Sequence, residues 1–324
     1  MSIEYLNRIH EEMVITEKDI DSYSEEESRA NIADVETLRD DLKEHILNPK
    51  SERGLKLESS KTHDVFRARP GELTVESGRQ GCGKSARHFL RAMSFAMQGQ
   101  NSLIASLEMR PIETLERGLY QYMGNTQPPV AKIDEFIDQF KGKIFIFKKI
   151  GTQTTDRMLN LVRFCAGNNI QHVFIDSLMK CSVRSSDIDS LEEFANQLQG
   201  LTKDLNVHVW LIAHQTKGGE GISKEDGVRG SGMLLDLADN YIYYEKNIKK
   251  FEAVAKQEQG GTLSAKEKAL LDKPDFFMEF RKQRHSTVAL PRNFGFYGHE
   301  SMQFLPSKSS IKMNDDDWKA GKFA

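Results

Sequence analysis

The sequence predicts an α/β fold that is built on a mainly parallel sheet and carries a phosphate-binding loop. From Gly71 onward, short apolar runs alternate with helix-forming stretches, which is typical of parallel strands joined by crossover helices. One run, Leu73–Glu76, leads into Gly78–Ser85, whose sequence GRQGCGKS matches G-x-x-x-x-G-K-[ST]. Ligands of such sheets bind beyond the carboxyl ends of the strands, so we expect the functional residues at that edge.

The first 60 residues are polar and acidic, and we expect them to form a helical extension that precedes a core domain at 61–310. Four apolar residues recur there at spacings of three and four, as on one face of an amphipathic helix. They are Val35, Leu38, Leu42 and Ile46. This narrow stripe could pack on its own domain or in a groove of a neighbouring subunit, and the residues alone leave both interpretations open.

The glycine-rich loop has the composition that a phosphate site needs. Glycines allow positive φ and a close approach of the backbone to a phosphate, while loop amides and the helix N-terminus stabilise its negative charge. Lys84 adds a point charge, and the Ser85 hydroxyl can bind Mg²⁺. We therefore predict a site for ATP or another ribo- or deoxynucleoside triphosphate; the alternative is a glycine turn that binds nothing. The predicted nucleotide-binding residues of the loop are Gly78, Arg79, Gln80, Gly81, Cys82, Gly83, Lys84, Ser85 and Ala86.

The alternation that follows the loop defines the expected sheet and its crossover helices. Strands are expected at Leu73–Glu76, Leu103–Leu107, Ile144–Phe147, Val173–Ile175 and Val207–Ala213. Helices are expected at Ala86–Met97, Ile112–Met123, Thr155–Ala166 and Leu191–Leu205.

Three polar residues stand at the ends of these strands. Asp176 ends the run HVFID and has the position of a Walker B carboxylate, which can hold Mg²⁺ through water. Glu108 could act as the general base on an attacking water, and His214 could contact a γ-phosphate. Each residue also has an alternative interpretation. Asp176 could be the carboxylate found at the tip of any buried strand, Glu108 a surface carboxylate and His214 a structural histidine.

The segment after His214 is rich in glycine and contains two lysines. Small residues let backbone amides reach a phosphodiester, and lysines neutralise phosphates. The predicted DNA contacts are Lys217, Gly218, Gly219 and Lys224. A solvated loop is the alternative interpretation, and residues 184–190 form a second candidate loop.

A late basic cluster follows the next strands. After Arg229 in a turn of small residues, strands are expected at Asn240–Tyr244 and Phe276–Phe280, and the second leads into RKQRH, which contains Lys282 and Arg284. Such a cluster is usually exposed to solvent. An arginine held at a subunit edge can also be delivered to a neighbouring subunit as an arginine finger.

Three further segments complete the expected organisation. The charged insertion at 246–275 is expected to form two short solvated helices on an outer face. A hairpin is expected between Val288–Leu290 and Met302–Leu305. Residues 311–324 are expected to be a flexible acidic tail.

Composition narrows the class of protein. The net charge of −3 argues against a uniformly basic nucleic-acid coat, so any DNA contact must be local. The three cysteines contain no C-x-x-C pair, which excludes a zinc ribbon or a disulfide framework and fits a reducing compartment. No apolar run reaches membrane-spanning length, and the first residues lack the core of a signal peptide. We therefore expect a cytoplasmic protein, in the host cytoplasm if the source is viral, with no membrane partner.

Together these features resemble a DnaB-type replicative helicase, and most closely the helicase half of the primase-helicases of short-tailed phages. The similarity extends from the helix near Val35 to Leu305 and rests on the order and spacing of six short segments. They are RPGELTVESGRQGCGKS, the SLEM of 106–109, the HVFID of 172–176, the AHQ of 213–215, the VRGSG of 228–232 and the KQR of 282–284.

The resemblance implies a RecA-like core in a homo-hexameric ring, with ATP and Mg²⁺ between subunits, single-stranded DNA in the central channel and movement from 5′ to 3′. It implies that Glu108 is the catalytic base, Asp176 the Walker B acid and His214 the γ-phosphate sensor. Lys84 and Ser85 would hold phosphate and Mg²⁺. The helix near Leu38 is then expected to dock on the next subunit as a linker.

The resemblance also assigns residues outside the loop and strand ends. Arg284, with Lys282, would reach into the neighbouring subunit's site as a finger, and Lys217 with its glycines would hold the DNA backbone. Gln215 and Arg229 would couple the ATP site to the DNA loop. Possible replisome partners are a primase, a polymerase and a single-strand-binding protein.

The chain departs from the family in three respects. It has no primase zinc site and only about 60 residues in place of a helical collar domain, its charged insertion is longer, and its basic loop contains fewer lysines. Two other functions remain as alternatives. One is a recombinase or recombination mediator that forms filaments, and the other is a helicase loader that uses ATP as a switch. The SLEM glutamate and the KQR cluster favour the motor over the recombinase, and a loader would need no finger in trans.

Overall fold

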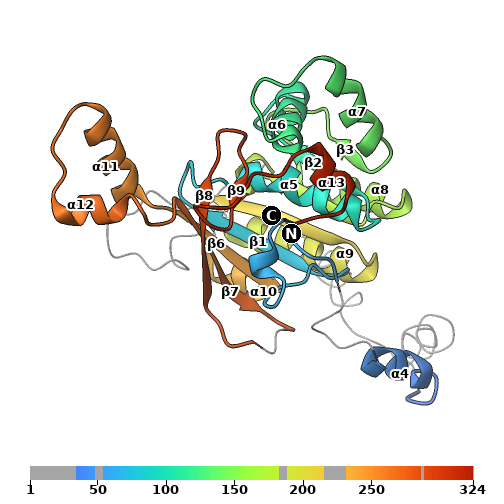
Figure 1. The fold of residues 1–324 in the computed structure, drawn as a ribbon. Coiled ribbons are helices and arrows are strands. Elements are labelled where there is room, and N and C mark those ends of the chain that lie inside the picture. Colours follow the sequence, from blue (N-terminus) through green and yellow to red (C-terminus); the bar gives the residue numbers. More distant parts are fainter. Residues whose placement is uncertain (1–33, 48–53, 182–187, 215–230, 286–287, 324) are drawn as a thin grey trace, which may run out of the picture. The chain divides into compact units, whose positions relative to one another are not determined.

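The chain forms two compact units, Met1–Pro49 and Lys50–Ala324 (Figure 1). A computed structural model describes residues 34–47, 54–181, 188–214, 231–285 and 288–323. None of the helices in these ranges is long and apolar enough to cross a bilayer.

The first unit contains the predicted amphipathic helix. Helix α4 spans Arg39–Leu47 and begins after Val35, which lies in a turn. The apolar residues of this region are exposed: Val35, Leu38, Leu42, Ile46 and Leu47. A helix is confirmed from Arg39 onward, whereas Val35 and Leu38 of the predicted stripe lie in the turn before it. The docking of this region on a neighbouring subunit stays a prediction.

The second unit is built on one large sheet. Among the described residues, nine strands follow the order β3-β2-β4-β5-β1-β6-β7-β8-β9. The pairs from β3 to β6 are parallel, and those from β6 to β9 are antiparallel. The strands are β1 Leu73–Gly78, β2 Ser102–Ser106, β3 Ile144–Ile146, β4 His172–Asp176, β5 His208–His214, β6 Asn240–Lys246, β7 Phe276–Gln283, β8 Arg292–Gly298 and β9 Phe304–Leu305. The predicted mainly parallel sheet is confirmed.

Helices cover both faces of the sheet, as Figure 1 shows. Because strand side chains alternate between faces, each face has its own core. The helices on one face are α5 Lys84–Met97, α6 Pro111–Met123 and α7 Ala131–Phe140. Those on the other face are α8 Thr155–Gly167, α9 Ile188–Asp204 and α10 Ser231–Leu237. Ile104, Phe174 and Trp210 pack with the first group, and Leu103 and Val173 pack with the second.

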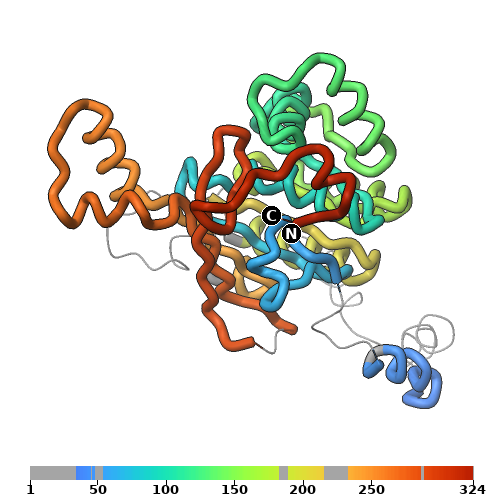
Figure 2. Tube along the Cα trace, viewed as in Figure 1, coloured from blue at the N-terminus to red at the C-terminus, as the bar shows by residue number. Residues whose placement is uncertain are grey.

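The charged insertion forms two helices, as predicted. Helices α11 (Ile248–Glu258) and α12 (Ala265–Leu270) stand apart from the other helices of this unit (Figures 1 and 2). Lys250 fixes their base, since its Nζ donates to the carbonyl of Lys273 at 2.7 Å and lies 2.8 Å from a carboxylate oxygen of Asp275.

The predicted hairpin between Val288–Leu290 and Met302–Leu305 is wrong in its first strand. The partner of β9 is β8, which begins at Arg292. Two glycines weaken the strand pattern of β8 in the sequence. Both are needed for close packing, because a Cβ at Gly295 would lie 2.4 Å from Pro274 and a Cβ at Gly298 would lie 2.8 Å from Phe276.

The chain end is folded, so the expectation of a flexible tail at 311–324 is wrong for its described residues. Helix α13 (Asp315–Lys319) packs beside α6, in the red part of the trace in Figure 2. Its Trp318 is 1% exposed. The boundary expected at residue 60 also shifts, because Leu57 and Glu58 are buried in the second unit. The acidic residues of the chain end lie in the first turn of α13, where negative charge is stabilising.

Candidate nucleotide-binding site

The glycine-rich loop connects β1 to α5 and adopts the conformation that its glycines permit. Gly78, Gly81 and Gly83 have φ of 146°, 74° and 90°. Space as well as φ requires glycine at two of these positions. A Cβ at Gly78 would lie 2.1 Å from the carbonyl oxygen of Tyr244, and a Cβ at Gly83 would lie 2.5 Å from the ring of Phe304.

Lys84 is the first residue of α5, and its side chain folds back over the loop. Its Nζ donates to the carbonyl of Gly78 at 2.7 Å and to that of Arg79 at 3.0 Å, and Cys82 Sγ lies at 3.5 Å. The lysine is buried. A buried cation that is held by neutral carbonyls at a helix N-terminus provides a suitable site for an anion.

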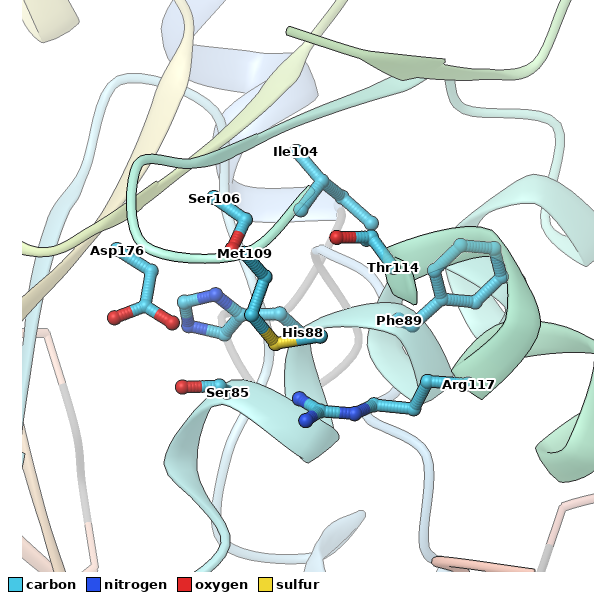
Figure 3. A pocket seen from close by; sticks show the side chains of 9 residues that line it. All are labelled: Ser85, His88, Phe89, Ile104, Ser106, Met109, Thr114, Arg117 and Asp176. Carbon is cyan, nitrogen blue, oxygen red and sulfur yellow. The ribbon is translucent and has the colours of Figure 1, made fainter. Parts of the chain in front are cut away.

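A small pocket lies beside the loop, where the carboxyl ends of β2 and β4 meet α5 and α6. Ser85 and Asp176 both line it, and Asp176 is 5% exposed (Figure 3). The full lining is Ser85, His88, Phe89, Ile104, Ser106, Met109, Thr114, Arg117 and Asp176.

The oxygens of Ser85 and Asp176 fit the preference of Mg²⁺, which takes one or two protein ligands and completes its shell with water and phosphate. No cluster of three or more histidine, cysteine or carboxylate ligands occurs within the described ranges. This donor set suits Mg²⁺ and does not suit a structural transition metal.

Arg117 is a pocket residue that the sequence analysis missed. It extends from α6 toward Ser85 (Figure 3). Burial lowers the pKa of its guanidinium, and the charge of Asp176 opposes this effect. Its Nε is buried and has no hydrogen-bond partner in the described part of the chain. The signal available in the sequence was its helical spacing from Thr114 and Gln121, both of which are buried on the same helix.

Glu108 and His214 lie together at the same edge of the sheet. Glu108 Oε1 is 3.8 Å from His214 Nε2 and accepts a hydrogen bond from the Ser177 hydroxyl at 3.4 Å. The Glu108 side chain is 44% exposed and that of His214 is 26% exposed. Both groups are therefore open to a ligand. No lysine or arginine in the described part of the chain pairs with the Glu108 carboxylate.

A buried ionic network supports the loop from below. Glu76 lies on β1 and accepts hydrogen bonds from Arg91 at 2.7 Å and from the Tyr244 hydroxyl. Arg91 and Arg87 also bind Glu58, at 3.1 and 3.0 Å. Burial alone would raise the pKa of Glu76, but the charge of Arg91 and the interactions of His88 together outweigh this effect and hold the pKa well below its usual range. The strand that leads into the loop is thus tied to α5 by ionised groups.

The basic cluster lies at the opposite edge of the sheet. Strand β7 is antiparallel to β6, and its last residue, Gln283, pairs with Asn240 at the start of β6. Asn240 pairs in turn with Thr74 near the start of β1. Lys282 and Arg284 therefore lie where the parallel strands begin, and the glycine-rich loop lies where they end. They are not brought into the pocket of their own chain.

Both basic side chains are held in place. Lys282 Nζ donates to the carbonyls of Leu235 and Asp236 at 2.7 and 2.8 Å. Arg284 donates to the Asp236 carbonyl at 3.1 Å, and its Nε lies 3.3 Å from Oδ1 of Asp239. Burial and the neighbouring charge of Arg284 lower the pKa of Lys282.

The predicted DNA-binding and coupling residues lie outside the described residues. They are Lys217, Gly218, Gly219, Lys224, Gln215 and Arg229.

The sequence matches no family model. Among solved structures, the chain is similar to the ATPase domain of a phage helicase, with a TM-score of 0.68 and 14% identity over 86% of this chain and 100% of that chain. It is also similar to a DnaB-like replicative helicase whose structure was studied together with its interactions with primase. The TM-score is 0.64 and the identity 16%, over 94% of this chain and 74% of that chain. The chain therefore has the RecA-like fold of the ATPase domains of DnaB-type helicases, as the sequence predicted.

Proposed function

We propose that this protein is an ATP-dependent DNA helicase that works as a ring of identical subunits, moves 5′ to 3′ on single-stranded DNA and separates the duplex. The observation that supports this proposal is the position of two groups of residues on one sheet. The glycine-rich loop, Ser85 and Asp176 lie at the carboxyl ends of the parallel strands, and an anchored lysine and arginine lie at the opposite ends. A complete site then needs two copies of the chain, as expected for a ring motor.

The first half-site would bind the nucleotide. Lys84 and the amides of the loop would hold the β- and γ-phosphates, and Ser85 and Asp176 would hold Mg²⁺. When bound, this ion neutralises charge that develops on the phosphates. Arg117, whose buried Nε has no hydrogen-bond partner within the described residues, would gain an anion as a partner. Deoxynucleoside triphosphates would fit the same phosphate site.

Glu108 would accept a proton from the attacking water, because it is exposed at the strand end and pairs with no lysine or arginine in the described ranges. His214, 3.8 Å from Glu108, would sense the γ-phosphate at the start of the segment that follows β5. A change in the phosphate would then reach Gln215, the DNA loop and Arg229.

The second half-site would act in trans. Arg284 and Lys282 would approach the γ-phosphate bound by the neighbouring subunit and stabilise the charge of the transition state. In a closed ring of six, every subunit would supply both halves. The exposed apolar residues of α4 and of the turn before it would help to hold adjacent subunits together.

DNA would bind in the central channel through Lys217, Gly218, Gly219 and Lys224. Lys217→Ala is expected to weaken binding of a single-stranded oligonucleotide and to lower the salt dependence of its affinity. By analogy with the DnaB-like helicase studied with primase, a primase would be a replisome partner. A polymerase and a single-strand-binding protein are further proposed partners.

A mixing experiment tests the shared site. Lys84→Ala and Arg284→Ala proteins are each expected to lack DNA-stimulated ATPase activity. In an equimolar mixed ring, about a quarter of the interfaces would combine an intact loop with an intact arginine, so a corresponding fraction of activity should return. Native mass spectrometry would verify co-assembly. Absence of rescue in verified mixed rings would contradict the proposal.

Strand displacement tests the motor itself. A forked duplex with a 5′ single-stranded tail should be unwound in the presence of ATP, and one with only a 3′ tail should not. Long filaments on DNA without strand displacement would identify a recombinase instead, and monomers with nucleotide-dependent conformations would identify a loader.

A further inference from the structure

His88 lies in the nucleotide pocket but has no part in the proposed chemistry. It stands three residues after Ser85 on α5, so the two side chains share a face of the helix. Both line the pocket, and the His88 ring lies beside Asp176 in Figure 3. The side chain is 2% exposed. A polar ring is therefore built into the wall next to the predicted Mg²⁺ ligands.

Within the described ranges, one ring nitrogen of His88 has a partner and the other has none. Its Nε2 lies 2.6 Å from Oε2 of Glu76. Glu76 is ionised, since Arg91 binds its other oxygen, and an ionised carboxylate can only accept. Nε2 therefore carries a hydrogen and donates it to Glu76. The remaining nitrogen, Nδ1, is buried and has no hydrogen-bond partner among the described residues.

We propose that Nδ1 of His88 accepts a hydrogen bond from a water molecule in the shell of the Mg²⁺ ion held by Ser85 and Asp176. This inference rests on the proposed function, because it requires that metal site. Mg²⁺ keeps several waters, and their polarised hydrogens need acceptors inside a buried pocket. Asp176 supplies one acceptor, and His88 supplies a second on the adjacent wall.

Glu76 gives the histidine its role as an acceptor. A carboxylate behind an imidazole fixes the tautomer, orients the ring and makes the free nitrogen a stronger acceptor. The network of Arg91, Tyr244 and Glu58 holds this carboxylate in turn. His88 thus acts as a positioning residue for the hydrated metal.

Two substitutions separate this role from a structural one. The amide of His88→Asn occupies the place of Nδ1 and cannot reach Glu76, whereas the amide of His88→Gln reaches Glu76 and leaves the place of Nδ1 empty. The proposal therefore expects the Asn variant to keep the response to Mg²⁺ and the Gln variant to lose it. If the bond between His88 and Glu76 is purely structural, the Gln variant should be the more stable of the two. Neither variant should then selectively lose the response to Mg²⁺.

The measurement is the affinity for a fluorescent ADP analogue with and without Mg²⁺, together with the Mg²⁺ midpoint at a fixed analogue concentration. For His88→Gln we expect the Mg²⁺ midpoint to rise about 10-fold or more, the range for loss of a partner to a metal's surroundings. Its affinity without Mg²⁺ should match that of the wild type. His172→Gln is the matched control, since His172 is equally buried but begins β4, at the end opposite to Asp176.

The outcomes are distinguishable. Equal Mg²⁺ midpoints for wild type and His88→Gln would overturn the role of His88, as would loss of the response in the Asn variant with retention in the Gln variant. Thermal melts without nucleotide would show that each variant is folded. If the wild type itself binds the analogue equally with and without Mg²⁺, the proposed metal site fails, and this result differs from a failure of His88 alone.

Discussion

The guanidinium Nε of Arg284 lies 3.3 Å from Oδ1 of Asp239, a residue with no exposed surface. Asp239 is itself fixed, because its other oxygen accepts the backbone N–H of Leu73 at 3.0 Å, at the start of β1. The arginine is thus anchored to the strand that ends in the phosphate loop, but at the far end of that strand. Its orientation is therefore fixed within its own chain, which would lower the cost of placing it in the proposed shared site.

Arg284→Ala should abolish turnover without weakening nucleotide binding to the same chain. Removal of an arginine finger lowers the rate of phosphoryl transfer by about 10³-fold or more. The measurement is DNA-stimulated ATPase activity, with fluorescent nucleotide binding measured on the same preparation. Arg281→Ala is the matched control: Arg281 lies on β7, which ends one residue before Arg284, and pairs with Glu279, so its loss should leave the rate within about twofold. An unimpaired Arg284→Ala enzyme would contradict a role in trans.

Glu108→Gln should lower ATPase activity by about 10²- to 10⁴-fold, the range for loss of a general base. The amide keeps the size of the side chain and its hydrogen bond from Ser177, so ATP should still bind and rings should still form. Single-turnover hydrolysis with bound ATP would measure the chemical step. Glu116→Gln, a change to a carboxylate on α6 that lies outside the pocket lining, serves as the control. A normal rate in the Glu108 variant would show that another group activates the water.

The parallel part of the fold could be predicted because each strand is a short apolar run with a turn or a helix on either side. The later antiparallel strands were harder. β8 contains two glycines that weaken its pattern, and their reason is a contact with Pro274 and Phe276 that only the folded chain makes. The folded state of the chain end could not be predicted for a related reason. Its composition is acidic, but one tryptophan and Met313 supply enough apolar surface to hold it on the domain.

The candidate site residues near the carboxyl ends of the parallel strands could be predicted from the sequence. Ser85 and Asp176 were placed together by the rule that ligands bind at the carboxyl ends of parallel strands, and both line one pocket. Arg117 and His88 were missed because they lie within helices whose spacing already explains a buried face. Only the packed structure shows that these polar groups, rather than apolar ones, point into the pocket.

Stability should fall as the pH decreases from 6.5 to about 5, partly because of His208. Burial lowers the pKa of this histidine from 6.5 to about 3. Its Nδ1 donates to the carbonyl of Arg69 at 2.6 Å, so Nε2 accepts from the Thr74 hydroxyl at 2.8 Å and the neutral ring is the folded form. The unfolded chain takes up a proton near pH 6.5 and the folded chain does not, so the loss reaches about 2 kcal/mol near pH 5.

Urea unfolding at a series of pH values would measure this loss. His208→Asn removes the titrating group and keeps a donor for Arg69, so its free energy of unfolding should depend less steeply on pH over this range. His172 remains in both proteins, and burial, the largest cause of its lowered pKa, is the same in both. Parallel pH profiles for the two proteins would contradict the assignment.

Trp318→Ala should release the chain end from the domain. Removing a buried tryptophan costs about 3–5 kcal/mol, which exceeds what the capping of a five-residue helix can supply. Because α13 is near the terminus, the helix should detach locally rather than unfold the whole domain. Hydrogen exchange in α13 should accelerate strongly while exchange in β1 stays slow, and protease cleavage near Lys319 should appear. Asp316→Asn, an exposed change on the same helix, should do neither. If α13 stayed protected in the Trp318 variant, the ion pairs of Lys132 and Lys319 rather than the indole would hold the tail.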